Sequence, residues 1–101
     1  MGEAGRPLAA EFLAAACTAL GIDVDRLTHG AGGDADRAFQ ELVALLGVGA
    51  FGLHVNELAG EVRETPEIVG RWLARGAMRR RRDRRFASRL AELEERLIAA
   101  S

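Results

Sequence analysis

Residues 55–75, VNELAGEVRETPEIVGRWLAR, decide the fold, because their pattern is typical of a helix-turn-helix. Leu58, Ala59 and Val62 stand at i, i+1 and i+4, a spacing that predicts the inner face of a short first helix. The small side chain of Ala59 leaves room for a second helix to cross the first one closely. This motif most often places its second helix in the major groove of DNA.

The second helix of the motif has signals at both ends. Thr65 is a candidate N-cap, and Pro66 stands at the first helical position, where its fixed φ and missing N–H cost nothing. Gly76 is predicted to follow the end of the helix as a C′ residue with positive φ. Between these ends the predicted inner face consists of Val69, Trp72 and Leu73.

The turn between the two helices departs from the usual pattern at two positions. Arg63 stands where glycine is favoured, and Glu64 follows where an apolar residue is usual. An arginine reaches the left-handed helical region only at some energetic cost. We therefore expect a turn that is either strained at Arg63 or longer and differently wound.

Length and composition predict one all-α domain of five to six helices, with a flexible N-terminus at 1–6, a helical core at 7–76, and an arginine-rich segment with a last helix at 77–101. Cys17 lies among alanines, which indicates a core residue rather than a nucleophile. The chain opens with no secretory signal, and no stretch approaches the ~20 apolar residues that span a bilayer. We therefore expect a cytoplasmic protein without membrane contact.

The spacing of apolar residues predicts where the other helices begin and end. The first is expected from about Pro7 to Leu20, and Gly21 is expected to end it. A short turn of helix follows at 22–27, and a second long helix is expected from Asp34 to Gly47. The glycine-rich loop that comes next carries an aromatic residue expected to fill a gap in the core, Phe51.

The last helix is expected to be long and amphipathic, from about Asp83 to Ala99. Its apolar residues fall at i, i+4, i+7 and i+11, which makes a continuous stripe. This stripe either closes the core of its own chain or pairs with a second copy to form a homodimer. The residues of the stripe are Phe86, Leu90, Leu93 and Leu97.

Charge is distributed unevenly along a chain whose net charge is only −1. Residues 1–70 carry four arginines and eleven acids, a net charge of −7. Residues 71–89 carry nine arginines and a single acid, Asp83, a net charge of +8. An anionic partner responds to such local potential rather than to the total. The basic segment is therefore the part of the chain that nucleic acid would meet.

The solvent face of the second motif helix is the candidate surface for base contacts. Arg71 is a candidate partner of guanine, and Glu67 is a candidate acceptor from the amino group of cytosine. Gly70 and Ala74 would permit close approach. With the arginines of the basic segment, the candidate DNA-binding residues are Thr65, Glu67, Gly70, Arg71, Arg75, Arg79, Arg80, Arg81 and Arg82.

Six arginines surround the expected start of the last helix, where positive charge opposes the helix macrodipole. One interpretation is that they bind the phosphate backbone and hold the recognition helix in register. The other is a solvated face that acids of the first seventy residues neutralise. The six residues are Arg79, Arg80, Arg81, Arg82, Arg84 and Arg85.

Catalysis and metal binding have no supporting pattern. His29 and His54 have no Cys, Asp or Glu at metal-ligand spacing. The glycines at 30, 32 and 33 are not followed by the GK[ST] of a phosphate-binding loop. We therefore expect no enzyme activity, no metal, no cofactor and no small-molecule substrate.

The order of elements resembles the C-terminal DNA-binding domain (domain IV) of the bacterial replication initiator DnaA, a Trp-repressor-like helix-turn-helix domain. The resemblance covers about residues 8–76 and is carried by EFLAAACTALGIDVDRL at 11–27, RAFQELVALLG at 37–47 and the motif itself. VGRWLARG at 69–76, followed by arginines and the DRRF at 83–86, is similar to DnaA-like domains at the C-terminus of REP-associated transposase-like proteins.

The resemblance implies binding of double-stranded DNA by a regulator, or by an accessory domain of a transposase or replication initiator. The recognition segment of the initiator, Arg-Asp-His-Ser/Thr-Thr-Val, corresponds here to ETPEIV at 64–69, in which only Val69 matches. Its basic loop corresponds to AGGDADR at 31–37, which is acidic apart from Arg37. We therefore expect a DNA site other than that of the initiator. The chain contains no tyrosine, so tyrosine-transposase chemistry is not expected.

Two other functions are consistent with the same residues. A non-catalytic protein–protein interaction module would keep the helix-turn-helix fold and have lost DNA binding. RNA binding through the arginine run is the weaker of the two, because the run lacks the interleaved aromatics that stack on single strands.

Overall fold

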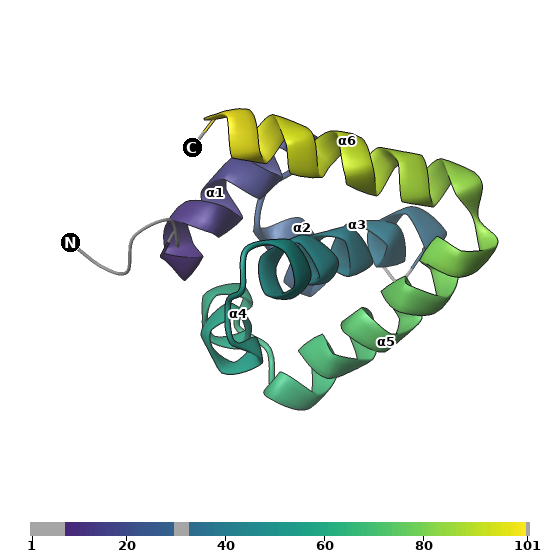
Figure 1. Cartoon of the computed structure of the whole chain (residues 1–101). Helices are drawn as coiled ribbons and strands as arrows, with labels where there is room; N and C mark the ends of the chain where they lie inside the picture. The colour runs from purple at the N-terminus through teal and green to yellow at the C-terminus, as the bar shows by residue number, and fades with distance from the viewer. Residues whose placement is uncertain (1–7, 30–32, 101) are drawn as a thin grey trace.

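The computed structural model describes residues 8–29 and 33–100, and within these ranges it is built from helices without any strand, which confirms the all-α prediction (Figure 1). The expected flexible N-terminus, residues 1–6, lies outside the described residues. The elements are α1 (Ala9–Leu20), α2 (Asp25–His29), α3 (Asp34–Ala44), the π-helix η1 (Leu45–Ala50), α4 (Val55–Val62), α5 (Pro66–Arg82) and α6 (Arg84–Ala100).

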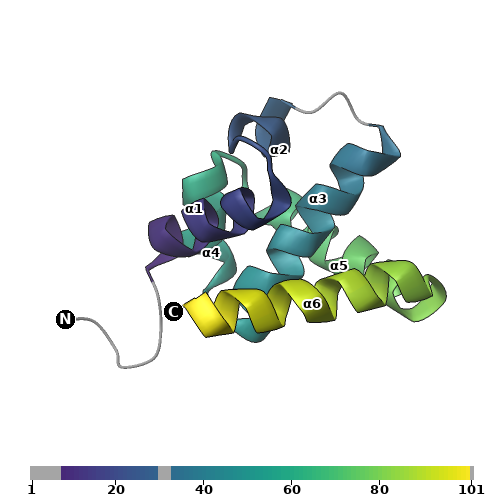
Figure 2. The same ribbon diagram turned by 90° about the horizontal axis from the view of Figure 1, so that it is seen from above.

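Two long helices and a central one organise the molecule. α5 and α6, with 17 residues each, meet at Asp83, and α3 with η1 lies between them (Figure 1). α1 packs against both α4 and α6 and closes the other end, as the view from above also shows (Figure 2). None of the described helices combines the length and the apolar character that crossing a membrane requires.

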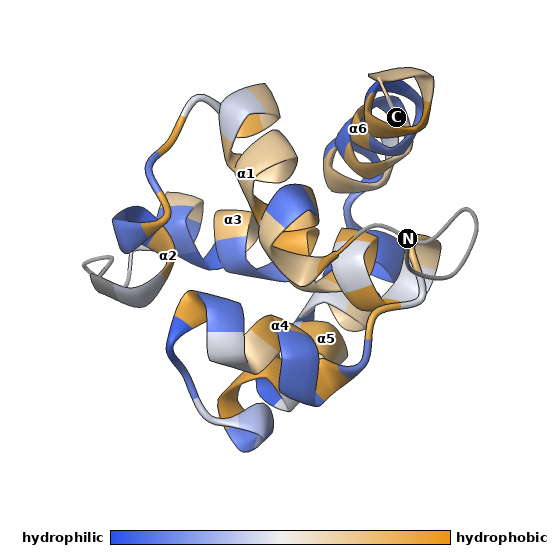
Figure 3. Cartoon of the chain, turned by 90° about the vertical axis from the view of Figure 1, so that its left-hand side faces the viewer, coloured by the Kyte–Doolittle hydropathy of each residue, from blue (hydrophilic) through white to orange (hydrophobic). Residues whose placement is uncertain are grey.

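The interior is one cluster of apolar side chains to which all six α-helices contribute. The apolar stripe of α6 belongs to it, because Phe86, Leu90, Leu93 and Leu97 are each only 5–6% exposed. The stripe therefore closes the core of its own chain. Seen from its C-terminal end, α6 alternates hydrophilic and apolar residues around its axis (Figure 3).

The first helix of the motif is α4, and the second, α5, begins where its capping residues predict. Thr65 is the N-cap of α5, and its hydroxyl oxygen accepts a hydrogen bond from the Ile68 amide at 3.2 Å. Arg63 adopts φ 61° and ψ 43°, and the amide of Glu64 donates to the carbonyl oxygen of Ala59 at 3.0 Å. Of the two turns expected from sequence, the structure therefore has the tight one, with the strain at Arg63.

The predicted end of the second motif helix at Gly76 is wrong. α5 continues to Arg82, and Gly76 lies buried inside it. A Cβ atom at this position would lie 2.9 Å from Leu45 Cδ1 and 3.1 Å from Glu41 Cβ. The glycine is thus needed for close approach of α5 to α3 and η1, not for a positive φ.

Two other boundaries differ from the expected ones. α3 ends at Ala44, and the chain continues as the π-helix η1 where an α-helix to Gly47 and then a loop were expected. The short helix expected at 22–27 forms slightly later, as α2. Phe51 does contribute to the core, since it is half-buried and its ring centroid lies 5.6 Å from that of Phe12.

Candidate nucleic-acid interface

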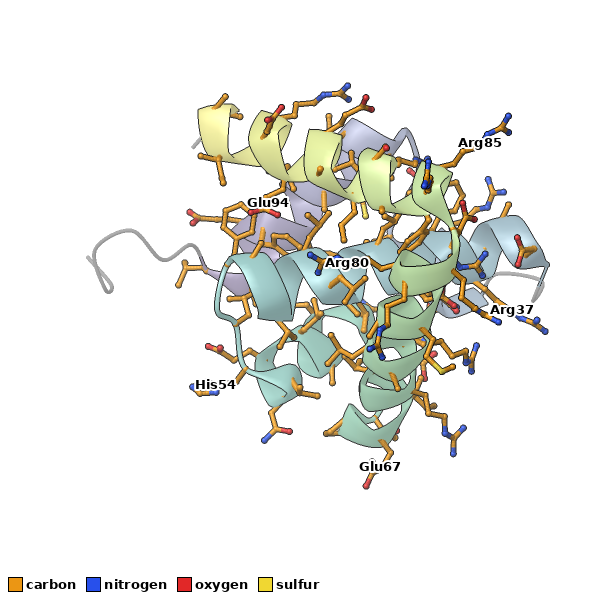
Figure 4. The ribbon with its side chains drawn as sticks, turned by 45° about the vertical axis from the view of Figure 1, so that its right-hand side comes forward. Arg37, His54, Glu67, Arg80, Arg85 and Glu94 are labelled. Atoms are coloured by element: carbon orange, nitrogen blue, oxygen red, sulfur yellow. The ribbon has the colours of Figure 1, made fainter. Side chains whose placement is uncertain are left out.

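The outward face of α5 has the composition that its helical spacing predicts. Glu67, Arg71 and Ala74 are exposed, and Gly70 is half-buried with open space beside its Cα. Glu67 projects away from the molecule at the first turn of α5 (Figure 4). The opposite face is in the core, as Trp72 is only 3% exposed. The first half of α5 therefore presents short side chains between two charged ones.

Because α5 extends to Arg82, most of the arginine run lies at the end of one helix and not at the start of the next. Residues 79–82 form its last turn, where positive charge complements the helix macrodipole instead of opposing it. Only Arg84 and Arg85 lie at the start of α6. There the Oδ1 atom of Asp83 accepts hydrogen bonds from the amides of Arg85 at 3.0 Å and Phe86 at 3.2 Å. Only Arg84 and Arg85 therefore oppose a helix macrodipole, and the expectation was wrong for the other four arginines.

The predicted contact arginines do not share one face of α5. Arg71, Arg75 and Arg82 follow one another along a single flank, at i, i+4 and i+11. Arg80 lies on another flank, where it lines a hollow of about 270 Å³ together with Glu94 of α6 (Figure 4). Arg81 is exposed between the two flanks. A single surface therefore brings together only part of the predicted set.

Arg79 is engaged inside the protein. Its Nε atom donates to Glu41 Oε1 at 2.5 Å, and its two terminal nitrogens donate to the carboxylate oxygens of Asp34 at 3.1 and 3.4 Å. Its guanidinium also lies over the ring of Phe86, 5.5 Å from the centroid. These hydrogen bonds raise the pKa of Arg79 and hold the pKa of Asp34 below its ordinary value. Arg79 therefore joins α5 to α3.

A hollow of about 310 Å³ lies between the first turn of α3 and the second half of α5, and we call it the arginine hollow. Arg37 of α3 lines this hollow, although it is not among the contact residues predicted from the sequence (Figure 4). No local sequence signal identifies Arg37, because it lies close to α5 only through the packing of α3 against α5. The hollow is lined by Asp34, Arg37, Glu41, Arg75, Met78, Arg79 and Arg82.

Acidic side chains surround the first helix of the motif. Glu57 and Glu61 are exposed on α4, and the Glu57 carboxylate accepts a hydrogen bond from the His54 amide at 2.9 Å. His54 is thus the N-cap residue of α4. Negative charge on α4 and at Glu67 therefore lies at this end of the motif, whereas most arginines of α5 lie toward its other end.

Two further observations concern metal binding and cysteine chemistry. Within 8–29 and 33–100, no group of three or more His, Cys, Asp or Glu side chains is placed to hold a metal ion. Cys17 is buried, and burial raises the pKa of its thiol, which disfavours the nucleophilic thiolate. The side chain of His29 lies outside the described part of the structure.

No family model matches the chain, and no curated protein or solved structure is found to be similar to it. The resemblance to the DnaA domain therefore stays a prediction that rests on the motifs quoted above.

Proposed function

We propose that the protein binds double-stranded DNA through α5. The observation that carries this proposal is the exposed flank on which Arg71, Arg75 and Arg82 follow one another, with Arg37 of α3 beside it. No acid lies within ion-pair distance of these four side chains among residues 8–29 and 33–100. Eleven residues of α-helix span about 16 Å, which is enough to reach more than one backbone phosphate.

The two halves of α5 have different roles in this proposal. The first half enters the major groove, which is wide enough for an α-helix, and Arg71 and Glu67 meet base edges. Gly70 and Ala74 add no bulk between them. In the second half, Arg75 and Arg82 contact phosphates and set the register of the helix. Regulation, or an accessory role in transposition or replication initiation, is the finer proposal that the DnaA resemblance supports.

Fluorescence anisotropy of a labelled random-sequence duplex, at several salt concentrations, tests the proposal. The triple variant Arg71→Ala, Arg75→Ala, Arg82→Ala removes the flank, and Arg80→Ala, Arg84→Ala, Arg85→Ala removes the same charge elsewhere. We expect the log–log salt slope to flatten by about 2 to 3 in the first triple and by less than about 1 in the second. Equal slopes in the two triples, or no binding at low salt, would refute DNA binding through this flank.

A second candidate is supported by the acids that the structure places around the motif. Asp34 and Glu41 neutralise Arg79, and Glu57 and Glu61 are exposed on α4. This distribution suits an interaction module that has lost DNA binding. The two candidates predict different results when Glu57 and Glu61 are changed to Lys. If the protein is an interaction module, duplex binding stays absent at every salt concentration. DNA binding predicts instead that the reversal strengthens it.

A further inference from the structure

Asp34 stands at the mouth of the arginine hollow and covers the outer edge of Arg79. Both of its carboxylate oxygens face the two terminal nitrogens of that guanidinium, at 3.1 and 3.4 Å. The Asp34 side chain is 80% exposed, whereas that of Arg79 is 20% exposed. The pair is therefore open to solvent on the Asp34 side only.

The inner edge of Arg79 is held in a different way. Its Nε atom donates to Glu41, whose side chain is 2% exposed, and Phe86 supports the plane of the guanidinium. Arg79 would therefore keep its position if Asp34 moved away. A guanidinium whose two terminal nitrogens point outward in a fixed plane matches two oxygens of a phosphate as well as those of a carboxylate.

Three further arginines surround this outward edge. Arg75 and Arg82 lie one turn before and one turn after Arg79 on α5, and Arg37 faces them from α3. Several arginines thus line the hollow, whereas Asp34 supplies only one negative charge to them. A phosphate group, whether it carries one negative charge or two, would be attracted by these arginines together.

We propose that the arginine hollow binds a phosphate group and that Asp34 occupies the place of this phosphate on Arg79 in the free protein. On binding, the phosphate takes over the two terminal N–H groups of Arg79, and the Asp34 carboxylate turns out into water. The inference rests on the proposed function for the source of the phosphate, which is the backbone of a DNA duplex. Asp34 thus acts as a competitor built into the fold, and it lowers affinity for DNA.

The first experiment compares Asp34→Ala with Glu92→Ala in duplex binding by anisotropy. Glu92 is exposed on α6, so both variants remove one negative charge, and only the first uncovers Arg79. We expect Asp34→Ala to bind about three- to tenfold more tightly than Glu92→Ala, with a salt slope steeper by about 1. Arg37→Ala, which removes an exposed side chain from the hollow, is expected to weaken binding.

The second experiment uses inorganic phosphate as the probe, so that it does not depend on DNA. Phosphate is titrated into ¹⁵N-labelled protein while the arginine Nε–Hε resonances are followed by NMR. We expect Arg75, Arg79 and Arg82 to shift, at lower phosphate concentration in Asp34→Ala than in Glu92→Ala.

The outcomes separate the two proposals. If phosphate shifts these resonances and no variant binds duplex, the hollow binds free phosphate and the DNA proposal fails. If duplex binds and Asp34→Ala equals Glu92→Ala while phosphate shifts nothing, the DNA proposal stands and the role of the hollow is overturned. Circular dichroism of each variant verifies that the helices are retained.

Discussion

Arg79 of α5 and Glu41 of α3 form an ion pair that is nearly closed to solvent, with side chains 20% and 2% exposed. A carboxylate removed from water is costly unless a hydrogen-bonded positive charge compensates it. Because the two residues belong to different helices, this pair ties the second helix of the motif to the centre of the molecule. Its loss should therefore affect the stability of the whole fold.

Arg79→Met removes the positive partner and leaves the Glu41 carboxylate buried. We expect the free energy of unfolding to fall by about 3 kcal/mol, as measured by urea denaturation. The double variant Arg79→Met, Glu41→Leu should recover most of this loss, because it removes the buried charge as well. If Arg79→Met costs no more than Arg81→Met, whose arginine is exposed, the pair has no structural role.

Gly70 and Gly76 lie on the same helix, and their replacement by alanine should have opposite effects. Gly70 has open space around it, so Gly70→Ala should raise the free energy of unfolding by up to about 1 kcal/mol through helix propensity. At Gly76 the added methyl group would lie 2.9 Å from Leu45 Cδ1. Gly76→Ala should therefore lower stability by about 1 to 3 kcal/mol. Urea denaturation of the two variants measures both, and the same sign in both would contradict the close packing.

Arg63 carries the backbone strain of the turn, and replacement by glycine should relieve it. Arg63→Gly is expected to raise the free energy of unfolding by about 1 kcal/mol, since φ is 61° at this position. Gly21 ends α1 with φ 73° and open space around it, so Gly21→Ala is the reverse experiment and should lower stability. A thermal melt that shifts downward for Arg63→Gly would show that the arginine side chain contributes more than its backbone costs.

Protonation of Asp34 at low pH should lower the free energy of unfolding. The hydrogen bonds and the positive charge of Arg79 hold the pKa of Asp34 below its ordinary value of about 4. A carboxyl with a lowered pKa in the folded state stabilises the fold above its unfolded pKa and loses this contribution as pH falls through the folded pKa. Between about pH 5 and pH 2, the urea midpoint of the native protein should therefore fall more than that of Asp34→Asn. Parallel curves for the two proteins would show that the contact with Arg79 does not persist in solution.

Local signals predicted the features that depend on a few neighbouring residues. Thr65 and Pro66 begin α5 because capping and the geometry of proline act within one turn. Gly21 ends α1 for a similarly local reason, its positive φ. The apolar stripe of α6 was also recognisable, but whether it packed inside or against a second copy depended on what else reached it.

The errors arose where distant parts of the chain meet. Gly76 has the local context of a helix end, and only the approach of Leu45 explains why it lies within one. Arg79 and Arg80 are neighbours in a run of identical residues, yet one is engaged by two acids of α3 and the other lines a hollow beside Glu94. No pattern in the run distinguishes them, because the difference comes from their angular positions around α5.

The contact at Gly76 also decides the direction in which α5 faces. Without a side chain there, the backbone of α5 packs directly onto Leu45 and Glu41, and this sets the separation of the helices. A bulkier residue would move α5 outward as a rigid rod, and every outward side chain along it would move together. The orientation of the whole exposed flank is thus set by Gly76, a buried residue on another face of α5.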